Sequence, residues 1–498
     1  MVTTRTDVLV VGAGPTGLML ATVLAQLGVD HVLIDGKAGP TTESRAVAVQ
    51  ARTLEIYDQL ELIDEVLAQS TRAEALSPGY LDRAYATIPL ANLGGRGTRY
   101  PFVTIFEQSR NERLLVAAHR DRGGEVLWKR QLEQLAVSTS GVTATLADGS
   151  RVEARYVVAA DGASSRVRQL TGIGFTGTTS AHTFFVIDAV QVEGLRPSTV
   201  SVRLGPGELL LAFPMGGGRD ARLIGVVPGE HPADDTLELA LRERIAARYR
   251  VTWGASNWLS TYRVHHRVAE RFRDGPVFLA GDAAHVHSPV GAQGMNTGLQ
   301  DAHNLACTLA DVLQGRASEA YLDSYEAERR PVARRVIAVT ERAFALVTSD
   351  RRAVRSAIRM LVPIVARVMG WLLPRVPLGR RVYGYLSQTR IRYPMPSGDA
   401  RGRHDSVVGR RLPPFAANHV PLRTFAWQVH AYGDGDRVGA RALGLPVYEF
   451  PAPRRGPLRA GWLYLVRPDG FVAAAAVTAQ ALKDGLPPPP EDGAGPTK

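Results

Sequence analysis

The sequence predicts an α/β fold with a parallel sheet, and three strand ends support this prediction. An apolar strand at residues 7–11 runs directly into the turn Gly12-Ala-Gly-Pro-Thr-Gly17. A second apolar strand at residues 156–160 ends in Asp161-Gly162, and a third at residues 277–280 ends in Gly281-Asp282. Strands buried in parallel sheets are continuous apolar runs, and ligands bind beyond their carboxyl ends. We therefore expect a ligand site at one edge of this sheet.

The first of these turns has the context of a dinucleotide-binding fingerprint. Gly12, Gly14 and Gly17 form a GxGxxG pattern, a helix is predicted at residues 18–27, and a strand at residues 31–34 ends in Asp35. The glycines permit the tight turn, the approach of a pyrophosphate and close helix–strand packing, while the acid accepts hydrogen bonds from a ribose. A tight turn without a ligand is the alternative. The flanking strands and the acid favour the nucleotide site.

The chain is organised around residues 277–301, which read as strand, turn, loop and helix. The loop contains Pro289, Gly291 and Gly294, and a helical pattern begins at Asn296. Because this loop has little side-chain bulk, its N–H groups and the helix N-terminus can approach a flat or anionic ligand. We expect Gly294 to use the backbone freedom of glycine. A glycine-rich surface turn is the alternative.

The chain contains three motifs, GAGPTG, DGASSRVR and GDAAHVHSPVGAQGMN. One flavoprotein family has these motifs in the same order and at similar separations. From about residue 7 to about residue 345 the chain resembles the single-component FAD-dependent aromatic hydroxylases of the para-hydroxybenzoate hydroxylase type, and most resembles the polyketide-tailoring and rifampicin-type members. The resemblance implies noncovalent FAD, NADPH or NADH as a transient reductant, and O2 as co-substrate. It also implies that oxygen is transferred from a flavin C4a-hydroperoxide to an electron-rich substrate.

The resemblance implies the fold class in more detail: α/β, with a Rossmann-like FAD-binding domain, an inserted antiparallel β-sheet substrate domain and a small thioredoxin-like C-terminal domain. Strand-like runs between residues 182 and 227 and a helix at residues 237–249 are expected in the inserted domain. The expected divisions are 1–175 for the first part of the FAD-binding domain, with a substrate-facing insertion near 70–100; 176–268 for the substrate domain; 269–390 for the return to the FAD-binding domain and its long helices; 391–485 for the C-terminal domain; and 486–498 for a disordered tail.

The candidate site residues follow from the motifs and from the resemblance, which adds Arg45 and Gln108 as contacts of the FAD. Expected cofactor-binding residues are Gly12, Gly14, Pro15, Thr16, Gly17, Asp35, Gly36, Arg45, Gln108, Asp161, Gly162, Gly281, Asp282, Pro289, Gly291, Gly294, Met295 and Asn296. Expected substrate contacts are Phe213, Pro214, Met215 and Pro289, at a strand end facing the domain junction. Because the flavin carries the chemistry, no catalytic side chain is assigned. Instead, Pro289, Gly291, Gly294 and Asn296 are expected at the flavin ring, where N–H groups stabilise charge. No metal site is expected. His285 and His287 are candidate acid–base groups, although the family's His at the first of these positions is mostly structural.

Composition limits the partners and the compartment. The net charge is +11 and the chain has only four lysines, so arginine supplies almost all the basic charge. Attraction of anionic cofactors or of nucleic acid is one explanation, and an Arg-, Ala- and Gly-rich proteome is the favoured one. No dense basic run with interleaved aromatics is present, so nucleic-acid binding is not expected. Cys307 is the only cysteine, which excludes a disulfide within the chain, and a buried thiol is expected.

No signal peptide is evident, and we expect a cytoplasmic monomer or homodimer that binds a small aromatic molecule and no membrane. Residues 358–373 are apolar but are interrupted by Arg359, Pro363 and Arg367, so they are too short and too charged to span a bilayer. A core-facing or interface helix is favoured there over membrane attachment.

The leading hypothesis is hydroxylation of a phenolic polycyclic aromatic such as a polyketide of antibiotic biosynthesis. Baeyer–Villiger oxygen insertion on the same scaffold is the alternative. A flavin-dependent halogenase is less favoured, because the WxWxIP signature of that group is not evident around Trp253 and Trp258. A non-catalytic flavoprotein is the alternative from a different class, and NADPH oxidation stimulated by an aromatic compound would exclude it.

Overall fold

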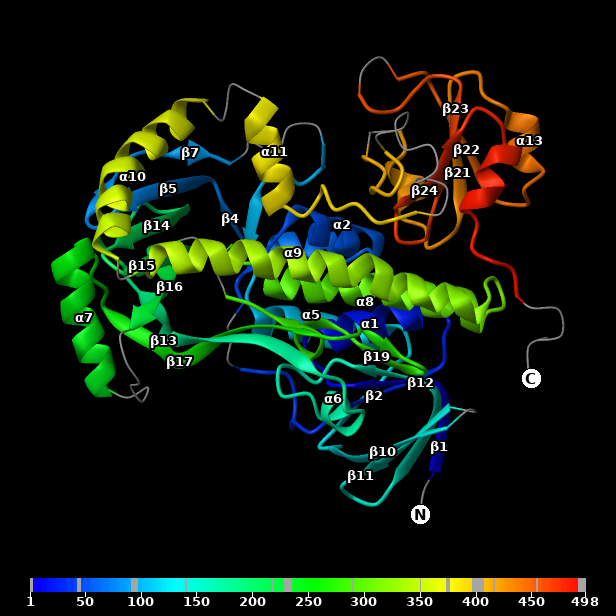
Figure 1. Cartoon of the computed structure of the whole chain (residues 1–498), viewed down its shortest axis with the longest axis horizontal. Helices are drawn as coiled ribbons and strands as arrows, with labels where there is room; N and C mark the ends of the chain where they lie inside the picture. The colour runs from blue at the N-terminus through cyan, green and yellow to red at the C-terminus, as the bar shows by residue number, and fades with distance from the viewer. Residues whose placement is uncertain are drawn as a thin grey trace.

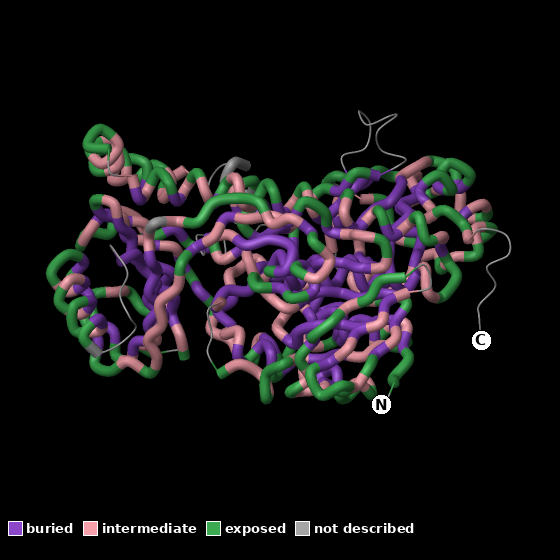
Figure 2. The backbone as a smooth tube through the Cα atoms, turned by 60° about the horizontal axis from the view of Figure 1, so that its bottom comes forward, coloured by how far each residue is buried: buried purple, intermediate pink, exposed green. Residues whose placement is uncertain are grey.

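The computed structural model describes residues 3–42, 46–90, 97–138, 141–216, 218–227, 235–288, 291–349, 351–372, 377–395, 407–414, 417–453 and 456–490. Within these residues the fold is mixed α/β, with parallel and antiparallel sheets, which confirms the predicted fold class. Figure 2 shows buried backbone concentrated in the interior of the molecule, along the strands and the helices packed on them.

The first sheet carries the nucleotide-type turns. Its order is β10 (Leu132–Ser138), β11 (Gly141–Leu146), β12 (Arg151–Ala159), β1 (Thr3–Val11), β2 (His31–Asp35) and β9 (Val126–Trp128), with β19 (Val277–Leu279) paired to β12 and β18 (Arg273–Asp274) paired to β19. The five strands β9, β2, β1, β12 and β19 run parallel to one another. Val11 is in register with Ala159, which is in register with Leu279. The three turns predicted from the sequence therefore leave neighbouring strands at the same edge.

Helices cover this sheet and complete its core. The helices of this part are α1 (Pro15–Gln26), α2 (Ala51–Gln59), α3 (Ile63–Ala68), α5 (Gln108–Asp121), α6 (Arg166–Leu170), α8 (Gly294–Leu313) and α9 (Asp323–Val347), with the short 3-10 turns η1 (Gly281–Ala283) and η2 (Glu319–Leu322). Helix α1 packs against α5 and α8. Cys307 on α8 is buried, as expected. Figure 1 shows α8 and α9 crossing the middle of the molecule.

The second sheet is almost entirely antiparallel. Its order is β20 (His285–Val286), β17 (Ala255–Ala269), β13 (Phe175–Val190), β16 (Asp220–Val227), β15 (Glu208–Met215), β14 (Thr199–Gly205), β5 (Ala75–Tyr80) and β6 (Arg83–Ala84), with β7 (Ile88–Pro89) also on β5. Only the β14–β5 pair is parallel among the pairings of this sheet in the described residues. A small third sheet is formed by β3 (Ala48–Val49), β8 (Val103–Ile105) and β4 (Thr71–Ala73).

Alternation along these strands builds two apolar layers, one on each face of the second sheet. Phe185 and Ile187 of β13 pack with Leu241 of α7 (Asp235–Tyr249) on one face. Phe184 and Val186, their neighbours along the strand, pack on the opposite face. Since successive side chains of a strand point to opposite faces, α7 covers one face and leaves the other for the site.

For helix α10 (Arg352–Leu372) the sequence favoured a core-facing or interface helix. Most of its apolar run is not buried in the core, because Ala366 is the only buried residue among the side chains described for this helix. Helix α11 (Pro377–Leu386) follows it. Among the described residues, no helix combines the length and the apolar character that crossing a membrane requires.

The C-terminal part forms a separate small sheet, seen at the upper right of Figure 1. Its order is β22 (Val447–Phe450), β21 (Gln428–Tyr432), β23 (Trp462–Val466) and β24 (Val472–Ala476), accompanied by α12 (His419–Leu422), α13 (Arg437–Arg441) and the 3-10 turn η3 (Gln480–Gly485). Of the tail expected at residues 486–498, residues 491–498 lie outside the described residues. The Pro488 carbonyl accepts a hydrogen bond of 2.8 Å from the N–H of Ser318.

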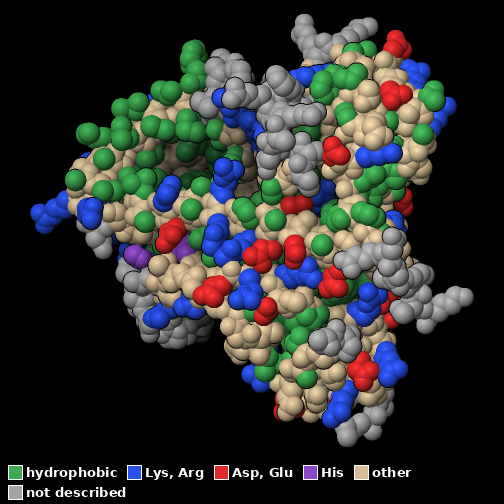
Figure 3. All heavy atoms as spheres, turned by 45° about the vertical axis from the view of Figure 1, so that its right-hand side comes forward, with side chains coloured by type: hydrophobic (Ala, Val, Ile, Leu, Met, Phe, Trp, Pro, Cys, Tyr) green, Lys and Arg blue, Asp and Glu red, His purple; other side chains and the backbone are tan. Residues whose placement is uncertain are grey.

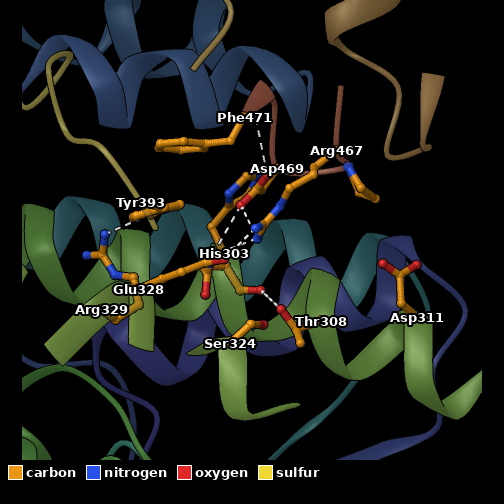
Figure 4. Close-up of polar contacts among 12 residues, drawn as sticks. His303, Thr308, Asp311, Ser324, Glu328, Arg329, Tyr393, Arg467, Asp469 and Phe471 are labelled. Carbon is orange, nitrogen blue, oxygen red and sulfur yellow. Dashed lines mark hydrogen bonds and ion pairs between the residues drawn. The ribbon is translucent and has the colours of Figure 1, made fainter. Parts of the chain in front are cut away.

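A buried polar network joins this C-terminal sheet to the long helices (Figure 4). Arg467, just after β23, donates to Glu328 of α9 (3.0 Å) and to Asp469 (2.9 Å). Asn304 of α8 donates to the same two carboxylates, at 2.8 and 3.1 Å. All four side chains are buried. The network therefore locks the C-terminal sheet to α8 and α9 by charge-assisted hydrogen bonds.

This network predicts a large loss of stability when one partner is removed. Arg467→Met leaves Glu328 and Asp469 as adjacent buried carboxylates, which costs about 3–5 kcal/mol. Arg441→Met removes an exposed pair with Glu449 and costs less than about 1 kcal/mol. Denaturant unfolding of the two variants measures the difference, and equal unfolding midpoints would contradict this account of the network.

Candidate active site

A cavity of about 1140 Å³ lies where the two large sheets meet. One wall carries the turns of the parallel sheet and the start of α8, and the opposite wall carries side chains of β15, β16 and β17. Of the candidate residues, the cavity wall includes Gly12, Gly14, Pro15, Thr16, Asp35, Gly36, Gln108, Asp161, Gly162, Asp282, Gly294, Met295 and Phe213. The structure therefore gathers most of the candidates around a single cavity. Arg45 and Pro289 lie outside the described residues.

The three glycines of the first turn meet three different steric demands. Gly12 has φ +105°, and a Cβ there would lie 2.4 Å from the Ala160 carbonyl oxygen. A Cβ on Gly17 would lie 1.8 Å from the Gly12 carbonyl oxygen, so this glycine allows α1 to pack closely on the turn. A Cβ on Gly14 would meet nothing within 4 Å, and Gly14 lines the cavity. Gly14 is thus the position where a ligand can approach the backbone.

Asp35 stands at the end of β2 beside this turn. Its carboxylate accepts hydrogen bonds from the N–H groups of Ala13 (2.6 Å) and Lys37 (2.7 Å). The Lys37 ammonium lies 3.8 Å from Asp35 and 3.6 Å from the buried carboxylate of Glu112. Gln108, the first residue of α5, donates to Glu112 at 3.0 Å. Lys37 and Glu112 also line the cavity, so charged groups of both signs surround its nucleotide end.

The third turn places one exposed carboxylate in the cavity. Gly281 has φ +59°, and a Cβ there would lie 2.4 Å from Thr16 Oγ1, so the turn packs directly on the start of α1. Asp282 follows it, is exposed and lines the cavity. A carboxylate in this position can accept hydrogen bonds from ligand hydroxyls.

The N-terminus of α8 faces the cavity through Gly294 and Met295. The first N–H groups of a helix have no partner within the helix and carry partial positive charge. Asn296 does not line the cavity, because its side chain is buried and fully engaged by the protein. Its Oδ1 accepts from Gln50 N–H and from Thr53 Oγ1, each at 2.8 Å, and its Nδ2 donates to Ala48 O at 2.9 Å. Asn296 therefore fixes the helix end rather than facing the cavity.

Two glycines of this loop differ from expectation. Gly294 does not have a left-handed φ, and a Cβ there would make an ordinary contact of 3.7 Å with the His287 ring. The expectation that Gly294 needs the backbone freedom of glycine is therefore wrong. That freedom belongs to Gly291, at φ +91°, which does not line the cavity. A role for Gly294 must therefore depend on the cavity space beside it, which a larger side chain would fill.

Asp161 serves α6 as well as the cavity. Its Oδ2 accepts from the N–H groups of Arg166 (2.7 Å) and Val167 (3.1 Å) at the start of that helix. Burial raises the pKa of this carboxyl, although these hydrogen bonds oppose the rise. Gly162 follows with φ +80°. Asp161 is thus held by backbone donors, whereas Asp282 is exposed to the cavity.

The two candidate histidines have different environments. His285 is fully buried and bonds through Nε2 to Asp301 at 2.7 Å, away from the cavity wall. His287 lines the cavity, and its Nδ1 bonds to the Ser288 carbonyl at 2.8 Å. A carbonyl only accepts, so Nδ1 carries the proton. Burial lowers the pKa of His287 to about 4, which keeps the ring neutral near pH 7.

The opposite wall of the cavity is largely apolar and aromatic. Phe213, Ile224, Tyr262 and Val264 line it. Pro214, the next residue after Phe213, points to the other face of the sheet and borders a separate hollow of about 250 Å³. Met215 returns to the same face as Phe213 and packs with the same apolar cluster, but it does not line the cavity.

A buried ion pair supports this wall and ties it to the nucleotide side. Arg222 of β16 donates to both oxygens of Asp188 at 2.6 Å, and its guanidinium lies 5.8 Å from the Trp258 ring centroid. The same guanidinium donates to the Ala46 carbonyl at 3.4 Å. Arg222 is fully buried. It therefore links the second sheet to the chain segment that adjoins Gln108.

The residues present fit FAD. Gly14 leaves open space for a pyrophosphate, Asp35 and Asp282 offer carboxylates to hydroxyls, and the α8 N-terminus offers N–H groups to a polar ring edge. The sequence alone did not indicate a role for Lys37, Ile224, Tyr262 or Val264, and it gave Glu112 no assignment. Lys37 had a usable signal, since it is one of only four lysines and lies two residues after Asp35. The other four residues had no such signal in the sequence, because their roles depend on which face of a strand or helix meets the cavity.

Comparisons with known proteins agree with this geometry. The family model described as "FAD binding domain" matches residues 5–340. A rifampicin monooxygenase from Streptomyces venezuelae is 33% identical over 428 residues, which are 84% of each chain. The 6-methylpretetramide 4-monooxygenase of Streptomyces rimosus is 37% identical over 76% of this chain and 67% of its own length. The solved structure of OxyS anhydrotetracycline hydroxylase from Streptomyces rimosus matches with a TM-score of 0.77, at 28% identity, over 97% of this chain and 100% of that one.

The two acidic turns predict different consequences of substitution. Asp282→Ala removes an exposed carboxylate that lines the cavity, so FAD should bind more weakly by roughly 1.5–3 kcal/mol. Asp161→Ala removes the acceptor at the start of α6 and should lower the free energy of unfolding by about 0.5–2 kcal/mol, with a smaller effect on FAD. Titration of both apoproteins with FAD, alongside denaturant unfolding, checks the contrast. Equal FAD affinity in the two variants would contradict it.

The space in front of Gly294 predicts a kinetic defect without unfolding. Gly294→Val should keep the fold, because the backbone is ordinary and a Cβ makes a permitted contact. Its branches should enter the cavity and displace the flavin from the helix N–H groups. Loss of one preorganised donor slows flavin reduction about a hundredfold, at roughly 3 kcal/mol. His287→Ala should leave reduction nearly unchanged. Stopped-flow reduction by NADPH, with bound FAD measured first, tests both variants, and a wild-type rate for Gly294→Val is the opposing outcome.

Proposed function

The chain belongs to the FAD-binding-domain family of flavin-dependent monooxygenases, and on this premise we propose that it hydroxylates a phenolic polycyclic aromatic compound of the polyketide type. The reaction consumes NADPH or NADH and O2, and it serves antibiotic biosynthesis. The observation that carries the proposal is the cavity itself. A nucleotide-type wall, which includes the N-terminus of α8, faces an aromatic wall across one space.

The relatives support the size and chemistry of the substrate. Relatives or structural neighbours of this chain are named for rifampicin, 6-methylpretetramide and anhydrotetracycline. A volume of about 1140 Å³ exceeds the usual range of single-ligand pockets, roughly 300–1,000 Å³, and suits a dinucleotide cofactor together with a substrate. The aromatic ring of Tyr262 and the apolar side chains of Phe213 and Ile224 favour a flat apolar molecule over a small polar one.

The residues of this chain bind the cofactor, orient the substrate and shield both from water. FAD, when bound, supplies the reducible ring on which dioxygen is activated. Gly14 and Asp282 hold the cofactor's polar parts, and the N–H groups at the start of α8 stabilise negative charge at the ring edge. Phe213, Ile224 and Tyr262 exclude water and position the aromatic carbon that receives oxygen. We assign no proton transfer to His287, because burial lowers its pKa to about 4, which makes its Nε2 a weak base, and its Nδ1 is already bonded to a carbonyl.

Baeyer–Villiger oxygen insertion is the second candidate, because it uses the same cofactor and cavity. Both reactions add one oxygen atom, so product mass does not separate them. The carbon skeleton does, since hydroxylation preserves the ring whereas insertion converts a ketone to an ester. NMR of the isolated product distinguishes the two reactions.

The decisive experiment measures NADPH and NADH oxidation by the FAD-loaded protein against a panel of aromatic polyketides. We expect stimulation by a subset of the panel and a product that carries one added oxygen. Phe213→Ala should lower kcat/KM for that substrate about 10- to 100-fold, the usual consequence of losing a large apolar contact, with FAD content unchanged. Pro214→Ala, on the other face of the same strand, is the matched control and should stay close to wild type. Oxidation that no aromatic compound stimulates would refute the proposal.

A further inference from the structure

Helix α10 presents a continuous apolar face to solvent. Its exposed apolar residues recur at helical spacing and are Met360, Leu361, Ile364, Val365, Val368 and Trp371. Met360 is 68% exposed and Ile364 57% exposed. In Figure 3, hydrophobic side chains gather at the upper left, where α10 lies in Figure 1, and they border a hollow. Contiguous exposed apolar patches on soluble proteins mark interaction sites.

The opposite side of α10 is firmly docked, so the exposed face is a property of the folded protein. The helix packs on β5, and Gly370 allows close approach, since a Cβ there would lie 2.9 Å from the Ala86 Cβ. Met369 packs into the apolar cluster of the second sheet. The Arg367 guanidinium lies 5.3 Å from the Tyr85 ring centroid. Because these contacts fix the helix orientation, the apolar residues on its other side remain outward.

The segment of the chain that contains α10 carries concentrated charge of one sign. Residues 351–398 contain ten arginines and no aspartate, glutamate or lysine, a local charge of +10. The whole chain carries +11, so the remaining 450 residues are almost neutral. An even compositional bias toward arginine does not produce this distribution. Arg352 and Arg359 are exposed on α10 itself.

The exposed apolar residues and the basic charge together indicate which kind of partner binds this face of α10. A second copy of the chain paired through α10 would bring two strongly basic segments together, which like-charge repulsion opposes. An anionic lipid surface satisfies both features, because acyl chains accept the apolar residues and headgroups attract the arginines. A helix with an apolar face, basic flanks and an aromatic near its end is typical of helices that lie in the membrane interface.

We propose that α10 attaches the protein peripherally to anionic lipid membranes, with its apolar face in the interface and its arginines at the headgroups. The same apolar cluster that receives Met369 of α10 contains Phe213 and Ile224 of the cavity wall. The inner side of α10 is therefore packed on the same apolar layer that forms the substrate side of the cavity.

The test is co-sedimentation of the FAD-loaded full chain with lipid vesicles. Vesicles of phosphatidylcholine containing about one third phosphatidylglycerol should carry the protein down at about 0.05 M salt, and binding should fall steeply at about 0.5 M salt. Vesicles of phosphatidylcholine alone should bind at least about tenfold less, since each attached arginine contributes to attraction. Ile364→Ser/Val368→Ser should lower the partition coefficient about tenfold or more by removing buried apolar area.

A matched double variant distinguishes vesicle binding through the α10 face from nonspecific binding through any exposed apolar side chain. Leu239→Ser/Val438→Ser removes two exposed apolar side chains from α7 and α13 and should bind vesicles like wild type. Both double variants should keep FAD and substrate-stimulated NADPH oxidation, which shows that they are folded. Absence of sedimentation with the anionic vesicles overturns the proposal, and so does equal binding by the α10 variant. Light scattering that shows a wild-type dimer dissociated by the α10 substitutions, without vesicle binding, would assign the face to a second copy.

Discussion

The buried carboxylate of Asp301 on α8 holds the candidate active site together. It accepts from the Arg329 side chain of α9 at 2.7 Å, from the His285 ring at 2.7 Å and from the Gly281 N–H at 3.2 Å. Burial opposes its ionisation, yet the neighbouring Arg329 and His285 keep the pKa of Asp301 below its usual value. One charge therefore fixes the third turn, strand β20 and helix α9 relative to α8. The bond to Gly281 fixes the turn that carries the Asp282 carboxylate at the cavity.

Motif residues divide into those that hold the fold and those that meet the ligand. Gly17 and Asn296 are enclosed by protein atoms. Gly17 allows close packing within the protein, and the Asn296 amide forms its hydrogen bonds with other protein groups. Gly14 and Asp282 border open space, and nothing in the described protein requires the missing Cβ of Gly14. A motif is thus a mixture of two kinds of constraint. The two kinds of residue can be distinguished only by their atomic surroundings in the structure, because both occur at the spacing of the same motif.

The sequence predicted the parallel sheet well because its signals are local. The strands ending at Val11 and Asp35, with the glycines between them, lie within about thirty residues, and apolar runs and turn residues suffice to find them. The opposite wall was predicted only in part. Phe213 lines the cavity while Pro214 does not, since register decides which face a strand residue takes. The docking of the C-terminal sheet depends on Arg467 and Glu328, which are 139 residues apart, and no local pattern encodes that pair.

The two walls of the cavity differ in how they are held, and this difference shapes the function. The α8 wall is braced on several sides: Asp301 ties it to the third turn and to α9, and Asn304 ties it to the C-terminal network. The facing wall consists of side chains projecting from β15, β16 and β17, whose backbones are fixed by sheet pairing while individual side chains remain replaceable. A rigid cofactor side permits preorganised N–H groups. Substitutions at Phe213, Ile224 or Tyr262 can then change the shape of the cavity without disturbing the N-terminus of α8.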